Sequence, residues 1–336
     1  MDYFDDQEVM NDLKIEKLGR CIFHRRDMFD WESSEAINDV ITFVSQMNEE
    51  IKGTIQIDNN NIKHTSIPWS SKVNLVLVIL QNVYERLIDH PSDLNNRSAL
   101  YFYELHDYIR SEGHAVIVQM YGDKGKHLTV ELPVYFKRSF GDPDKMQYGI
   151  EHELSFIMFL IGLYKLNFLS SSDGQFTVCL LFNRYKLKAS NNFGNFGLSD
   201  FHFLSFLWGS GQLIGNIHNI IPISIDSYTE AKIHKNNYIF MTCLNMIHNY
   251  EKKEPFWKHS YQLWNLKALS SWEKVNKGLM SMFKKSILSN YDVAKHLYFG
   301  ELLKFRKDIN CFEEQFYNRL EVQLNQSNAE EVEVES

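Results

Sequence analysis

The chain has 336 residues, of which 44% are hydrophobic and 14% aromatic, enough to build a large hydrophobic core. Its formal net charge of -8 argues against a nucleic-acid partner, because neutralising phosphates requires a basic face. The four cysteines are scattered and include no Cys-x-x-Cys pair, which argues against a zinc knuckle or a disulfide framework and favours a reducing compartment.

Two long helices are expected in the N-terminal part of the chain. Residues 1–20 are charged and lack the basic and apolar regions of a secretory signal, so we expect a flexible arm there. Between residues 33 and 53, apolar side chains recur at helical spacing, with a serine pair before them and a glycine as the stop. Residues 70–91 repeat this arrangement from a second serine pair to a proline. The stretch 54–67 fits either a small hairpin or an exposed loop.

Helical patterns continue through the middle of the chain. Residues 95–109 are rich in tyrosine, and residues 133–140 form a short amphipathic pattern that begins with a proline. The most apolar run, 154–169, is too short and too interrupted by polar residues to span a membrane, so we expect a buried helix and no membrane partner. A further helix is expected over 176–187, with basic residues at its C-terminal end.

The C-terminal half shows the same spacing, in residues 200–213, 228–250, 272–289 and 309–324. Residues 325–336 are charged and contain no core-forming pattern, so we expect a disordered acidic tail. Helical periods dominate and no internal repeat is found. We therefore predict an all-α, irregular multi-helix single domain over residues 21–324.

The stretch from Gly194 to Gln212 combines two different patterns. Its first half places two glycines, an asparagine, a serine and an aspartate within seven residues, which is typical of a turn. Aromatic and leucine side chains follow at close spacing, so the stretch predicts a loop that leads into a buried helix. Asp200 is placed either to cap that helix or to present a carboxylate at the mouth of a cleft.

Two catalytic motifs are incomplete. His152-Glu153 lacks the second histidine four residues later that a zinc protease needs on the same helix face. Residues 124–126, Lys-Gly-Lys, lack the full glycine spacing of a phosphate-binding loop. Without other information, His152 is most simply a histidine whose hydrogen bonds are satisfied at the start of a helix.

Four ordered blocks of this sequence resemble those of the phosphotyrosyl phosphatase activators, also named protein phosphatase 2A activators. Gly194–Gln212 is similar to the family hallmark, and Tyr148–Glu153 resembles the Tyr-Gly-Thr-Gly-His-Glu block. The third and fourth blocks are Pro255–Leu279 and His296–Leu303. Four blocks in the same order, spread over about 160 residues, are far more specific than one short motif.

The resemblance implies an all-helical fold with core, linker and lid subregions. It also implies an activator and assembly factor of protein phosphatase 2A, which binds the catalytic subunit together with the scaffold subunit and promotes its active, metal-loaded conformation. Family members are peptidyl-prolyl isomerases of proline-containing peptides, bind ATP with Mg²⁺, and lie in the cytoplasm and the nucleus. Two alternatives are an autonomous prolyl isomerase and a non-catalytic scaffold that has lost nucleotide binding.

The resemblance also carries site residues. The family's nucleotide-binding positions are occupied here by Lys145, Ile150, Glu151, Lys295, His296 and Leu297, and its magnesium-associated positions by Gly194 and Asp200. Lys145 keeps a positive charge without the bidentate fork of an arginine, and Glu151 places a carboxylate where phosphates would lie. These substitutions predict weakened direct binding of ATP.

Prolyl isomerisation needs no nucleophile, because a pocket that favours the twisted amide lowers a barrier of about 18–20 kcal/mol. The resemblance places Asp200 and Gly197 near the reacting bond. The positions it implies for the peptide or the partner are Tyr148, His152, Glu153, Phe196, Phe201, Phe206, Trp208, Gly209, Trp264, Trp272, Lys274 and Asn276. The alternative for the aromatic members of this set is that they belong to the core.

Overall fold

The computed structural model describes residues 18–56, 70–88, 107–109, 131–142, 148–185, 202–250 and 254–306, and it confirms the all-α fold class. Within these ranges no β-strand occurs, and one isolated bridge joins Gly19 to Phe299. The hairpin or loop expected after residue 56, most of the tyrosine-rich helix before Ile109, the helix 309–324 and the acidic tail lie outside the described residues.

The two expected N-terminal helices are present. Helix α2 (Glu35–Glu50) begins after Ser34, whose hydroxyl accepts the N–H of Ile37 at 3.2 Å, and the chain turns away at Gly53 with a φ of 67°. Helix α3 (Ser71–Ile88) begins after a second serine, whose hydroxyl accepts the N–H of the third residue that follows at 3.2 Å. Both starts follow from the serine caps that the sequence predicts. A short helix that the sequence did not predict, α1 (Met28–Glu32), precedes α2.

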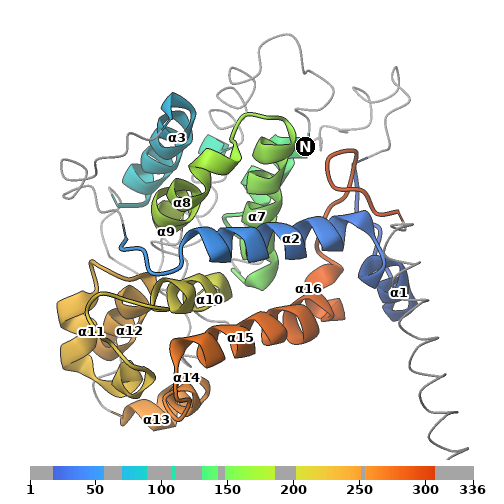
Figure 1. The fold of residues 1–336 in the computed structure, drawn as a ribbon. Helices are drawn as coiled ribbons and strands as arrows, with labels where there is room; N and C mark the ends of the chain where they lie inside the picture. The colour runs from blue at the N-terminus through green and yellow to red at the C-terminus, as the bar shows by residue number, and fades with distance from the viewer. Residues whose placement is uncertain are drawn as a thin grey trace, which may run out of the picture.

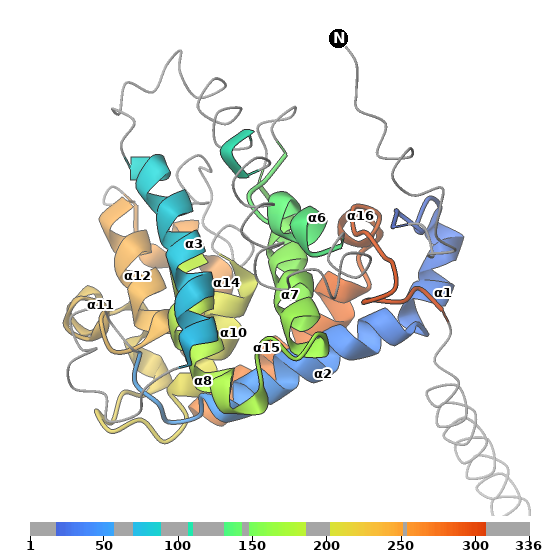
Figure 2. The same cartoon turned by 90° about the horizontal axis from the view of Figure 1, so that it is seen from above.

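Helix α7 (Ile150–Lys165) packs against α6 (Glu131–Arg138) and α2, as Figure 2 shows. Every side chain from His152 to Leu163 is buried, which confirms the expected buried helix. Because its apolar residues cover the whole circumference, the helix needs neighbours on all sides. None of the described helices is long and apolar enough to cross a membrane.

A continuous helical rod follows α7 in the sequence. It consists of α8 (Gly174–Phe176), a π-helical stretch η7 (Thr177–Phe182) and α9 (Asn183–Tyr185). The rod confirms the helix expected from Phe176 as far as Tyr185, where the described part of this segment ends. The wide turns of η7 bring six consecutive buried side chains into the core.

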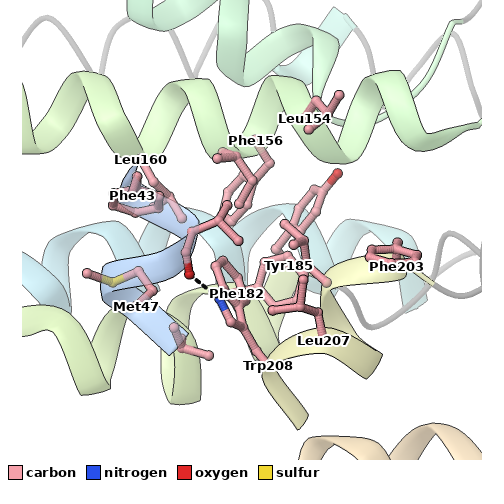
Figure 3. Packing of buried hydrophobic residues seen from close by; sticks show 14 of the residues in the cluster. Phe43, Met47, Leu154, Phe156, Leu160, Phe182, Tyr185, Phe203, Leu207 and Trp208 are labelled. Carbon is pink, nitrogen blue, oxygen red and sulfur yellow. Dashed lines mark hydrogen bonds between the residues drawn. The ribbon is translucent and has the colours of Figure 1, made fainter. Parts of the chain in front are cut away.

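Helix α10 (Phe203–Gln212) lies at the centre of the molecule, and all ten of its residues are buried. Figure 3 shows its Trp208 beside Phe182, with the indole N–H donating to the carbonyl of Val44 on α2 at 3.1 Å. Gly209 faces α12, where an added Cβ would lie 2.5 Å from the backbone nitrogen of Phe240. The glycine therefore allows two helices to approach each other closely.

The prediction of one continuous helix over residues 228–250 was wrong. The chain instead forms α11 (Tyr228–His234) and α12 (Ile239–Tyr250), separated by a turn. The side chain of Gln212 accepts the N–H of Ile239 at 2.9 Å, so a residue of α10 caps the start of α12. This cap comes from 27 residues earlier in the chain and has no local signal.

Short helices complete the C-terminal half: η9 (Pro222–Asp226), α13 (Phe256–His259), α14 (Tyr261–Leu266), α15 (Trp272–Met282), η10 (Phe283–Leu288) and α16 (Tyr291–Ala294). The expected helix 272–289 is confirmed as α15 followed without a break by the π-helical η10. Its first N–H groups are capped by Ser271, whose hydroxyl accepts the N–H of Lys274 at 3.4 Å.

Candidate functional site

The first turn of α7 caps the first turn of α10. The two carboxylate oxygens of Glu153 accept the backbone N–H groups of Phe203 and Leu204, each at 2.9 Å. The first N–H groups of a helix have no partner within that helix, so Glu153 satisfies two donors of α10 that would otherwise be unpaired. Phe203 lies 50 residues after Glu153 in the sequence. Burial raises the pKa of Glu153 to about 8, although both hydrogen bonds lower it. The Tyr148–Glu153 block and the hallmark block are therefore joined directly.

A chain of buried hydroxyl and imidazole groups lies beside this cap. The hydroxyl of Tyr185 donates to the carbonyl of Ser139 at 2.7 Å, and the hydroxyl of Tyr148 lies 2.6 Å from the Tyr185 hydroxyl. Because each hydroxyl has one proton, Tyr148 donates to Tyr185 and accepts from Nδ1 of His202, which lies at 3.0 Å. Burial raises the pKa of both tyrosines well above the usual value, so both stay protonated.

His202 directly precedes helix α10 and is the first described residue of this segment. Its backbone φ of 22° is rare for a residue with a side chain, and its Nδ1 lies 3.9 Å from the Glu153 carboxylate. Such backbone strain is retained only where the surrounding contacts fix it. Sequence reasoning did not single out His202, because its role depends on Glu153, Tyr148 and Tyr185, which are distant in the sequence.

His152 lies on α7 next to this network and joins it to the fourth block. Its Nδ1 donates to the carbonyl of Arg138 at 2.6 Å, and burial lowers its pKa, which favours the neutral imidazole. The guanidinium of Arg138 in turn donates to the carbonyl of His296 at 3.0 Å and lies 4.4 Å from the centre of the Tyr298 ring. Arg138 thus connects the Tyr148–Glu153 block to the His296–Leu303 block, although Arg138 belongs to neither block.

Glu131 of α6 holds the rest of the fourth block. Its carboxylate accepts the N–H groups of Glu301 and Leu302 at 2.5 and 3.0 Å, and it also accepts the hydroxyl of Tyr135 at 2.9 Å. An added Cβ at Gly300 would lie 2.6 Å from this carboxylate. A glycine is needed there because the buried carboxylate approaches the backbone so closely.

The third block reaches α10 through Asn276 on α15. The amide nitrogen of Asn276 donates to the carbonyl of Leu207 at 2.9 Å, and Asn276 exchanges two hydrogen bonds with Asn48 on α2 at 2.9 and 3.0 Å. The indole of Trp272 donates to the carbonyl of Ile220 at 2.8 Å. All four blocks therefore contain described residues that are connected to α10 or α7.

The aromatic positions expected to form a peptide-binding wall are placed in two different environments. Phe206 and Trp208 have no exposed surface, and Trp272 is 4% exposed, so in this structure they belong to the core. Trp264 is half-buried, with the ammonium of Lys267 at 4.8 Å from its ring. Among the described positions implied for the peptide or the partner, Lys274 is the one charged side chain that is exposed.

The described residues that correspond to the family's nucleotide site do not fit a phosphate group. At the start of α7, where N–H groups could bind an anion, the carboxylate of Glu151 folds over Gly149, and an added Cβ there would lie 2.4 Å from its oxygen. Lys295 pairs with Asp292 at 2.5 Å, and Leu297 is buried. Ile150 is half-buried, as is His296, whose carbonyl is the acceptor of Arg138.

The remaining sequence-predicted site residues lie outside the described ranges. They are the suggested metal-associated and reacting-bond positions Gly194, Gly197 and Asp200, the wall positions Phe196 and Phe201, and the cation Lys145. Among the described residues, no group of three or more histidine, cysteine, aspartate or glutamate side chains could hold a metal ion.

Comparison with known proteins gives a consistent family. The chain is 29% identical over 309 residues to the serine/threonine-protein phosphatase 2A activator of Drosophila melanogaster, covering 87% of this chain and 74% of the relative. It is 27% identical over 309 residues to the probable serine/threonine-protein phosphatase 2A activator 1 of Dictyostelium discoideum, covering 87% of this chain and 91% of that relative.

A solved structure shares the fold. The crystal structure of the PP2A phosphatase activator Ypa1 PTPA1 superposes with a TM-score of 0.76 and 22% sequence identity, covering 89% of this chain and 98% of that one. The model of the phosphotyrosyl phosphate activator (PTPA) protein family matches residues 19–305. Because this match spans most of the sequence, the chain belongs to the phosphotyrosyl phosphate activator (PTPA) family.

Proposed function

We propose that this protein activates protein phosphatase 2A by binding its catalytic subunit, with the scaffold subunit present, and promoting the active metal-loaded conformation. Family membership and the names of the relatives support this proposal. The structural observation that carries it is the capping of α10 by Glu153, because it unites two sequence blocks that are characteristic of the family.

The cap defines how the site would act. Residues 194–201 precede α10 directly, and the first turn of α10 is fixed by Glu153, while His202 is held by Tyr148. A binding segment that is attached to a rigid base is well suited to recognise one partner. We therefore propose that residues 194–201 and the exposed Lys274 contact the phosphatase, while the buried members of the four blocks position them.

The test is binding followed by reactivation. The purified chain is mixed with inactive catalytic subunit, alone and with scaffold subunit, and both complex formation and phosphatase activity are measured. We expect a complex and a rise in activity. We also expect Lys274→Glu to weaken the complex at least fivefold, and Lys284→Glu, an exposed lysine of η10, to leave it unchanged. If no complex forms at micromolar concentrations, the proposal is refuted.

We propose prolyl isomerisation as a second activity, with Asp200 and Gly197 near the reacting bond of a proline-containing peptide. The strained backbone of His202, two residues after Asp200 in the sequence, supports a constrained site there. Exchange spectroscopy on an X-Pro peptide should show faster cis–trans exchange with the wild-type chain and not with Asp200→Ala. An unchanged exchange rate with the wild-type chain would remove this activity, and it would leave the activator proposal intact.

A further inference from the structure

A basic and aromatic surface lies near the N-terminal end of the described chain. We call it the N-terminal patch and define it by Arg20, Phe23, Arg25, Arg26, Tyr291 and Lys295. The three arginines are exposed, and the Phe23 side chain is 58% exposed. The patch combines the apolar area of an exposed aromatic ring with positive charge, so it suits a partner segment that offers both apolar and acidic side chains.

Contacts within the patch hold its members together. The hydroxyl of Tyr291 donates to the carbonyl of Phe23 at 2.7 Å, which ties α16 to the N-terminal segment. The Arg25 guanidinium and the Lys295 ammonium lie 5.4 and 5.2 Å from the centre of the Tyr291 ring. The Arg20 guanidinium lies 6.0 Å from the Phe23 ring. These distances are typical of cation–π contacts and show one continuous surface.

Two aspartates lie among these four cations, and both are already engaged. Asp27 accepts the N–H groups of Phe23 and His24, each at 2.8 Å, and lies 3.7 Å from Arg26. Asp292 pairs with Lys295. Positive charge therefore remains in excess on the patch, while the next exposed acids, Asp30 and Glu32, follow on α1.

The C-terminal end of the described chain runs beside the segment that carries the patch. Gly19, before the patch, exchanges two backbone hydrogen bonds with Phe299 at 3.0 and 2.8 Å. Glu35, after it, donates its N–H to the carbonyl of Arg306 at 2.9 Å, and the two side chains pair at 2.6 Å. Figures 1 and 2 both show the red end of the chain next to α1. The described chain therefore ends at Arg306, beside the segment that carries the patch.

Residues 309–336 have the chemistry that complements this surface. They contain seven glutamates and one arginine, and apolar side chains recur at 309, 312, 316, 320 and 324. A helix of sixteen residues would be about 24 Å long, enough to reach across the patch from Arg306. We propose that residues 309–336 of this chain dock on the N-terminal patch of the same molecule, with glutamates facing the arginines and Phe312 or Phe316 against Phe23.

Attachment at Arg306 favours the same molecule over a second copy, because a short connection gives the segment a high effective concentration at the patch. Docked there, the segment would compete with any acidic partner for the patch. This inference is independent of the proposed phosphatase activation, and a phosphatase assay does not enter its test.

The test is a cross-linking experiment on the full chain. Cys179 and Cys243 are buried, so in a Cys21→Ser background Arg26→Cys provides one accessible thiol to pair with Cys311 through a short bismaleimide. The control places the thiol at the exposed Lys232 of α11, at the opposite end of the molecule from α1 in Figure 1. We expect at least a tenfold higher yield of the intramolecular product for Arg26→Cys, independent of protein concentration.

A charge exchange makes the test specific. Arg20→Glu with Arg25→Glu should lower the yield at least fivefold, and adding Glu313→Arg with Glu314→Arg should restore it. Equal yields from residues 26 and 232, or a product that forms only between two chains and increases with concentration, would overturn the inference.

Discussion

The buried carboxyl group of Glu153 should make the stability of this protein depend on pH between 6.5 and 8.5. Its pKa is raised from 4.5 to about 8 in the folded protein by burial. The folded state therefore holds a proton that the unfolded state releases above pH 4.5. This contribution to stability is fully present below pH 4.5 and is lost as the pH rises through about 8.

The magnitude follows from the two pKa values. Between pH 6.5 and 8.5 the free energy of unfolding should fall by about 2 kcal/mol because of Glu153 alone. Three histidines, His152, His234 and His248, have pKa values lowered by burial, so their effects lie mainly below this interval. Urea unfolding at pH 6.5, 7.5 and 8.5 measures the fall.

Glu153→Gln is the control, because a glutamine cannot ionise. Its amide group has one acceptor oxygen, whereas both oxygens of the Glu153 carboxyl group accept an N–H, so the variant should be less stable at pH 6.5 by about 1–3 kcal/mol. Its stability should also change little up to pH 8.5. If wild type and variant lose stability in parallel, to within about 0.5 kcal/mol, the carboxylate is ionised in the folded protein and the reasoning is refuted.

Three further predictions concern the α10 contacts and the nucleotide. Asn276→Ala leaves the buried Asn48 without its partner and should cost about 2–4 kcal/mol by urea unfolding; a loss below about 0.5 kcal/mol would contradict the pairing. Gly209→Ala forces a methyl group against the backbone of Phe240 and should cost about 1–3 kcal/mol, whereas an unchanged midpoint would show that α12 can move aside. ATP with Mg²⁺ should leave the melting temperature of the isolated chain unchanged, because Glu151 covers the start of α7. This prediction would be contradicted if ATP clearly raised the melting temperature of the wild type and raised that of Glu151→Gly no further.

Local patterns were sufficient to predict most of the helices. The serine before α2 and the apolar circumference of α7 act within one segment, so the sequence reveals them directly. The break between α11 and α12 was missed because its cap comes from Gln212 on another helix. Apolar spacing continues through residues 228–250 even though the backbone turns, so periodicity alone could not locate the turn.

The candidate site was only partly predictable for the same reason. The family blocks identified Tyr148, His152 and Glu153, but their partners Tyr185 and Arg138 lie outside the blocks and carry no motif: Tyr185 is buried between two blocks, and half-buried Arg138 precedes all four. Their contribution depends on three-dimensional contacts. Conversely, the aromatic residue Trp208 belongs to a block and is completely buried, so its presence there reflects packing.

Helix α10 also determines how the molecule can be divided. It comes from the middle of the chain, yet its side chains are enclosed by α2 from one half and by α12 and α15 from the other. A cut near residue 200 would therefore leave each fragment with a large uncovered apolar surface. Two such fragments, expressed separately, should acquire a cooperative unfolding transition only after they reassociate.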